Sequence, residues 1–108
     1  MKPSQVIAEP GSWTTGTFAR ASDESVAGVY SKEACKFCAL GACMKAFYRE
    51  GNGFLLGGRE FELILGNLIG AVAVGTWNDM PGRTHEEVVA LLKQAEQIFV
   101  EDYPEYAI

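Results

Sequence analysis

Basic side chains are scarce in this chain of 108 residues, and long apolar runs are missing. Nine lysine and arginine residues stand against fourteen aspartate and glutamate residues, a formal net charge of −5. That balance argues against a protein that grips a phosphate backbone, so a nucleic-acid partner is not expected. The longest apolar stretch, residues 63–74, is interrupted by Gly66, Asn67 and Gly70. It is too short and too broken for a membrane span, which needs about eighteen apolar residues or more.

Cysteine and histidine are also rare, with three cysteines and one histidine. Residues 1–10 lack the charged start, apolar middle and small-residue cleavage site of a secretory signal, which makes the cytoplasm the expected location. Cys35, Cys38 and Cys43 agree with this expectation, because an odd number of closely spaced thiols suits a reduced state. If all three lay on one helix, Cys43 would sit about 12 Å along the axis from Cys35, too far for one four-coordinate metal site. We therefore expect the three cysteines to be small buried hydrophobic residues, and we expect no metal and no cofactor.

The composition fits one compact domain over residues 1–108, since 48% of the chain is hydrophobic and 21% charged. Hydrophobic periodicity predicts an all-α (mainly α) fold of three to four helices after an irregular N-terminal segment. The first predicted helix covers residues 32–49 with Ser31 as its N-cap. A second covers residues 59–69, and the run that follows, 70–75, fits either more helix or a short buried strand. The last begins at Thr84, which forms a capping box with Glu87, and ends before Pro104.

Two weaker signals concern close packing in the first half of the chain. Residues 13–21 favour extended structure, but a lone strand has no obvious partner, so we expect an ordered loop packed by Trp13 and Phe18. Gly41 stands inside the first predicted helix, where glycine costs about 1 kcal/mol relative to alanine. A close approach by another segment of the chain would explain its presence there.

Residues 77–85 are the most distinctive segment. Pro81 and Gly82 suit the central positions of a type II turn. Asn78 and Asp79 can bond to backbone groups of such a turn, and Trp77 can anchor it. A purely structural role would account for these residues. The turn does not require Arg83 or His85. Both stand at the positive end of a helix, where a negatively charged group can be held. A binding surface and a catalytic site are therefore kept open beside the structural interpretation. The candidate binding residues are Arg20, Trp77, Asn78, Asp79, Pro81, Gly82, Arg83, Thr84 and His85.

Several of these residues belong to motifs that resemble those of a family of small uncharacterised bacterial and phage proteins. The motifs are Phe37-Cys-Ala-Leu-Gly-Ala42, then Trp77-Asn-Asp-x-Pro-Gly-Arg-Thr84, preceded by a stretch with Trp13, Gly16, Ala19 and Arg20. The resemblance covers roughly residues 13–95. It implies no activity, but it does imply a phage or prophage setting, in which small acidic proteins commonly bind host proteins.

The sequence leaves two functions open. The first is a non-enzymatic protein-binding module. A specific version of this hypothesis is a phage or prophage factor that acts on a host protein. It would dock through Arg20 and residues 77–85 or through its acidic C-terminal half, where three basic and nine acidic residues give 3 − 9 = −6 over residues 55–108. The alternative is a small-ligand-binding protein or a hydrolase that uses Asp79, Arg83 and His85 as one cluster. A homo-oligomer is left open.

Overall fold

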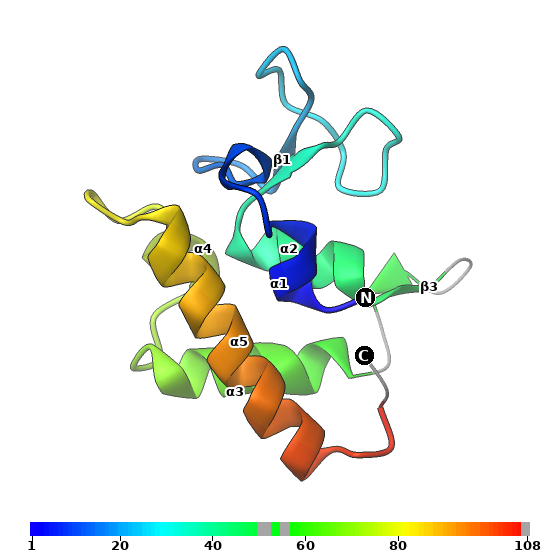
Figure 1. Cartoon of the computed structure of the whole chain (residues 1–108), viewed down its shortest axis with the longest axis vertical. Coiled ribbons are helices and arrows are strands. Elements are labelled where there is room, and N and C mark those ends of the chain that lie inside the picture. Colours follow the sequence, from blue (N-terminus) through cyan, green and yellow to red (C-terminus); the bar gives the residue numbers. More distant parts are fainter. Residues whose placement is uncertain (50–52, 55–56, 107–108) are drawn as a thin grey trace.

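Helices make up most of the regular structure (Figure 1) of the computed structural model, which describes residues 1–49, 53–54 and 57–106. The helices are α1 (Pro3–Val6), α2 (Ala39–Ala46), α3 (Gly58–Leu68), α4 (Val74–Asn78) and α5 (His85–Asp102), with a 3-10 turn η1 at Pro10–Ser12. The antiparallel strand pairs are β1 (Ala19–Arg20) with β2 (Lys36–Phe37), and β3 (Tyr48–Arg49) with β4 (Gly53–Phe54). The predicted mainly α-helical fold is confirmed.

The core lies where α5 crosses α3 (Figure 1). Both helices follow the predicted apolar stripes, and their buried apolar residues are Phe61, Ile64, Leu65, Val88, Leu91, Leu92, Ala95 and Phe99. Phe47, just after α2, completes an aromatic cluster with Phe61 and Phe99, at ring-centroid distances of 5.4 to 5.6 Å. Such tilted and edge-on arrangements favour aromatic pairs beyond the area that they bury. Within the described ranges, no helix is both long and apolar enough to cross a membrane.

The predicted helix over residues 32–49 is shorter than expected. Helix α2 begins at Ala39, and its N-cap is Cys38 rather than Ser31. The backbone N–H groups of Cys35 and Cys38 donate to the carbonyl oxygens of Arg20 and Phe18, at 3.0 and 3.1 Å, instead of to helical carbonyls. Ser31 still accepts a hydrogen bond from the N–H of Glu33 at 3.2 Å, so it makes a cap-like contact in a turn that does not continue as a helix.

The missing helical turns explain a second difference. Residues 36–37 form β2 and pair with Ala19 and Arg20, so the segment predicted as a lone loop does have a strand partner. Trp13 packs against the core as expected, but the Phe18 side chain is 48% exposed. The expectation that Phe18 packs this segment is therefore wrong.

Gly41 confirms the expected close approach. A Cβ atom at this position would lie 2.1 Å from the carbonyl oxygen of Phe18. That carbonyl oxygen also accepts the hydrogen bond from the N–H of Cys38. The absence of a side chain at Gly41 thus lets the chain before β1 pass directly over α2.

Residues 70–75 neither extend α3 nor form a strand. Gly70 and Ala71 both have positive φ, 77° and 67°, and the N–H of Ala71 donates to the carbonyl of Gly66 at 2.7 Å. This left-handed break ends α3. The chain then enters α4, which carries Trp77 and Asn78.

Candidate binding site

The turn between α4 and α5 has the predicted form. The N–H of Arg83 donates to the carbonyl of Met80 at 3.0 Å, and Gly82 has φ of 83°, as the third position of a type II turn requires. Thr84 then begins α5 through the predicted capping box. Its hydroxyl accepts from the N–H of Glu87 at 3.2 Å, and the Glu87 carboxylate accepts from the N–H of Thr84 at 2.9 Å.

The capping box makes part of the stability dependent on pH. Hydrogen bonds from the backbone N–H and hydroxyl of Thr84, with help from Arg83, lower the pKa of Glu87. A lowered pKa in the folded state means that this stabilisation is present above the ordinary glutamate pKa of about 4.3 and is lost as pH falls through the folded value. We expect the free energy of unfolding of the native protein to exceed that of Glu87→Gln at pH 7, with the difference shrinking below about pH 4. Glutamine keeps the capping geometry, so urea titrations from pH 7 to 3 isolate the charge. A difference that stays constant over this range would contradict the assignment.

Asn78 is the structural centre of the segment. Its side chain is fully buried, and its Oδ1 accepts from the indole N–H of Trp13 at 2.8 Å and from the N–H of Ala39 at 2.9 Å. Its Nδ2 donates to the carbonyl of Thr14 at 3.1 Å and to the Oδ1 of Asp79 at 2.9 Å. One amide therefore joins the N-terminal loop, the start of α2 and the end of α4, and this inward orientation removes Asn78 from any exposed binding surface.

Arg83 is held by its own turn. Its Cζ lies 3.7 Å from the centroid of the Trp77 ring, and its Nε donates to the carbonyl of Trp77 at 3.0 Å. Its Nη1 donates to Glu87 at 3.1 Å, and its Nη2 lies 3.3 Å from the sulfur of Met80. All three guanidinium nitrogens have partners at the end of α4, in the turn or in the first turn of α5, so Arg83 stabilises this junction.

Arg20 and His85 are likewise engaged. The Arg20 guanidinium donates to the hydroxyl of Thr14 and to the carbonyl oxygens of Thr15 and Glu24, at 3.0 to 3.1 Å. The Nε2 of His85 lies 2.6 Å from the carbonyl oxygen of Ile7. These side chains fix the N-terminal loop and tie it to α5.

Asp79, Arg83 and His85 do not form a shared cluster. Asp79 bonds to Gly16 and Asn78, Arg83 bonds within its turn, and His85 bonds near α1. Within the described part of the chain, no hydrogen bond or ion pair joins any two of the three. This arrangement gives the hydrolase alternative no geometric support.

Asp79 is a charged candidate residue at the surface, and one of its two carboxylate oxygens has no hydrogen-bond donor among the described residues. Its Oδ1 accepts from the N–H of Gly16 at 3.0 Å and from Asn78, whereas its Oδ2 accepts no hydrogen bond from the described residues. The residue is exposed. The two internal bonds therefore fix the direction of this carboxylate without neutralising it.

A small pocket of about 240 Å³ lies beside this carboxylate. The residues that line it are Gly16, Thr17, Phe18, Cys38, Gly75 and Asp79. Asp79 is among the candidate binding residues predicted from the sequence, whereas Phe18 is not, because it was expected to pack the N-terminal loop. Phe18 lies just before β1, and its side chain is exposed whereas that of the next residue, Ala19, is fully buried; a strand of two residues gives no periodic signal that would reveal this from the sequence.

The three cysteines occupy different environments. Cys38 and Cys43 are buried as small apolar residues, as predicted, but Cys35 is exposed, so the predicted burial is wrong for this residue. Burial raises the pKa of the Cys38 thiol and, more strongly, of the Cys43 thiol. Among the described residues, no group of three or more histidine, cysteine, aspartate or glutamate side chains is placed to hold a metal ion.

This arrangement predicts selective thiol chemistry. We expect Cys35 to react with a disulfide reagent in the folded protein, and Cys38 and Cys43 to react at least about a hundredfold more slowly, because the thiolate is the reactive form and both thiols are buried. Labelling in buffer and in denaturant, with mass analysis of the peptides, measures the rates. Cys35→Ser should abolish the fast phase. Equal rates for all three thiols in the folded state would be inconsistent with the structure.

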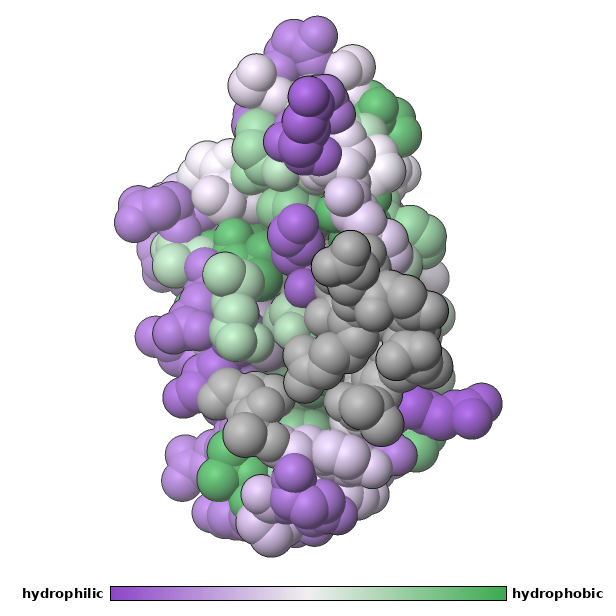
Figure 2. Space-filling model, turned by 90° about the vertical axis from the view of Figure 1, so that its right-hand side faces the viewer, coloured by the Kyte–Doolittle hydropathy of each residue, from purple (hydrophilic) through white to green (hydrophobic). Residues whose placement is uncertain are grey.

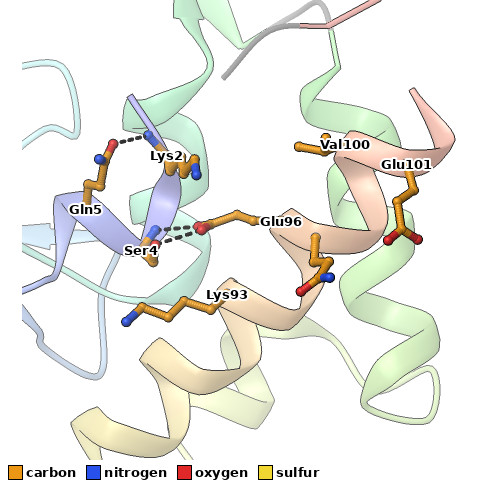
Figure 3. A pocket seen from close by; sticks show the side chains of 8 residues that line it. Lys2, Ser4, Gln5, Lys93, Glu96, Val100 and Glu101 are labelled. Atoms are coloured by element: carbon orange, nitrogen blue, oxygen red, sulfur yellow. Dashed lines mark hydrogen bonds between the residues drawn. The ribbon is translucent and has the colours of Figure 1, made fainter. Parts of the chain in front are cut away.

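A second, larger groove of about 560 Å³ runs between α1 and α5 (Figure 3). Its floor is Glu96, only 5% exposed, whose two oxygens accept from the N–H and the hydroxyl of Ser4, both at 2.7 Å. Lys2 and Lys93 flank this contact. Because both carboxylate oxygens are occupied, Glu96 serves to hold α1 on α5.

The sequence matches a family of unknown function, DUF6197, over residues 3–98, and the chain belongs to this family. No curated protein and no solved structure matches the chain.

Proposed function

We propose that the chain is a non-enzymatic protein-binding module whose docking surface comprises Phe18, Asp79 and the pocket between them. The single observation that carries this proposal is an exposed phenylalanine next to a small pocket with a fixed carboxylate whose outer oxygen is free. Aromatic side chains and small pockets are the anchors of protein interfaces, where a few residues supply most of the binding energy.

The size of the pocket supports a protein partner over a metabolite. Small-molecule sites usually enclose about 300–1,000 Å³. The pocket beside Asp79 holds about 240 Å³, a space suited to one side chain of a partner. On the face shown in Figure 2, apolar residues of the described part of the chain lie among hydrophilic ones.

The charge of the chain supports a basic partner surface. A net charge of −5 attracts a positively charged protein over distances of about a Debye length, 8 to 10 Å, and accelerates its encounter. We propose further that the module works in the cytoplasm as a phage or prophage factor on a host protein, on the strength of the resemblance of its motifs to those of bacterial and phage proteins.

Affinity capture with matched variants tests the docking surface. Immobilised native chain, Phe18→Ala, Asp79→Asn and Leu63→Ala are exposed to a bacterial lysate, and each recovered protein is then purified and titrated by calorimetry. Leu63 is the control, because it is a similarly exposed apolar residue on α3, 64% accessible. We expect Phe18→Ala and Asp79→Asn to weaken binding about tenfold or more and Leu63→Ala to have no effect. Equal affinity for all four chains would reject this surface.

A further inference from the structure

The most informative feature of the docking surface is the unbalanced charge of Asp79. In the described residues the ion pairs are Lys36 with Glu24 and Arg83 with Glu87, and neither includes Asp79. No basic residue lines the pocket beside it. The N–H of Gly16 and the buried amide of Asn78 hold the Asp79 carboxylate in one orientation. The carboxylate therefore does not rotate towards a basic side chain of the same chain.

The remaining walls of the pocket are uncharged. Gly16 and Gly75 contribute no side chains, and no atom lies within 4 Å of where a Cβ would stand on Gly75. The thiol of Cys38 is neutral, because burial raises its pKa. Phe18 contributes an exposed aromatic ring. The pocket thus combines one negative charge, one aromatic ring, the uncharged side chains of Thr17 and Cys38, and the backbone of two glycines.

These features select among possible occupants. An anion is repelled by Asp79, and an apolar side chain would desolvate the carboxylate without replacing its hydrogen bonds to water, which is costly. One carboxylate is too few ligands for a calcium or zinc ion. A guanidinium fits all the features, because it is a planar cation that donates to carboxylates, stacks on aromatic rings and carries an apolar stem.

We infer that this pocket binds an arginine side chain of a partner protein, with the guanidinium on the free oxygen of Asp79 and the stem along Phe18. This inference rests on the proposed function and specifies the partner chemistry. The arginine would form an ion pair with Asp79, which has none among the described residues. Arg20 and Arg83 do not line the pocket, and their guanidinium groups are engaged in internal hydrogen bonds; Nη2 of Arg20 lies 3.3 Å from where a Cβ would stand on Gly16, but Arg20 makes no ion pair with Asp79.

Amide chemical-shift titration of the whole chain tests the inference directly. The probes are N-acetyl-arginine N-methylamide and its citrulline counterpart, which has nearly the same shape without the charge, each added up to 100 mM at constant ionic strength. We expect saturable shifts at Gly16, Thr17 and Gly75 with the arginine probe and a dissociation constant about tenfold higher, or no saturation, with citrulline. Asp79→Asn should abolish the difference between the probes. This variant keeps an oxygen for the bonds from Gly16 and Asn78, so the fold is retained.

Two outcomes would overturn the inference. One is that the arginine probe gives no saturable shift at these amides. The other is that the native chain binds the citrulline probe as tightly as the arginine probe, or that the Asp79→Asn variant binds the arginine probe as tightly as the native chain does. The protein-binding function has a separate outcome. If a captured partner loses affinity with Phe18→Ala but not with Asp79→Asn, the module stands and the arginine assignment falls.

Discussion

Replacement of Asn78 with leucine is expected to destabilise the fold by about 3–5 kcal/mol. The change removes the hydrogen-bond partner of the Trp13 indole, of the Ala39 N–H and of the Thr14 carbonyl at once. Each buried polar group left without a partner costs about 1–3 kcal/mol, and we take the lower part of that range because Trp13 and Thr14 are only half-buried. Urea unfolding, followed by tryptophan fluorescence, measures the loss as a lower midpoint at an unchanged slope.

A double-mutant cycle with Trp13→Phe separates the hydrogen-bond effect from a packing effect. Phenylalanine keeps most of the aromatic area but has no N–H, so in that background Asn78→Leu leaves one donor fewer unsatisfied. We expect the cost of Asn78→Leu to fall by about 1 kcal/mol in the Trp13→Phe chain. If the two effects simply add, the hydrogen bond from Trp13 to Asn78 contributes no stability, and the cost of Asn78→Leu comes from its other contacts.

Sequence reasoning succeeded where local signals decide the structure. Helix α5 has a capping box at Thr84 and an apolar stripe at helical spacing, and helix α3 has a similar stripe. The type II turn at Pro81 and Gly82 is likewise fixed by residues within the turn. In each case the residues that determine the structure are fewer than about five positions apart, so their pattern is visible in the sequence.

It failed where the deciding contacts join distant segments. The residues before α2 pair with Ala19 and Arg20 as a two-residue strand, far too short for a periodic signal. Because residues 36–37 were predicted as helix, Ala19 and Arg20 had no predicted strand partner, and Phe18 was expected to pack a loop. At the candidate site, the sequence marked residues 77–85 as distinctive but did not reveal which residues they contact. Asn78 bonds to residues 39 and 65 positions away, and no pattern in the sequence reveals that it turns inward.

Gly41→Ala is expected to reverse the sign that helix propensity assigns to it. Alanine in the middle of a helix normally stabilises by about 1 kcal/mol relative to glycine. Here the new Cβ would lie 2.1 Å from the Phe18 carbonyl oxygen, which is backbone and is itself held by the N–H of Cys38. Overpacking usually costs about 1–3 kcal/mol, and displacement of backbone lies at or beyond the upper end, so we expect a net loss of about 2–4 kcal/mol. The midpoint of urea unfolding reports it.

Gly66→Ala on α3 is the matched control. No atom lies within 4 Å of the position of its Cβ, so the intrinsic preference for alanine is unopposed and a gain of about 0.5–1 kcal/mol is expected. Opposite signs for the two substitutions would establish that the chain before β1 rests on α2. A stabilising Gly41→Ala would mean that the Phe18 carbonyl can move away at little cost. The position of Phe18, and with it the docking surface, would then not be fixed by this contact.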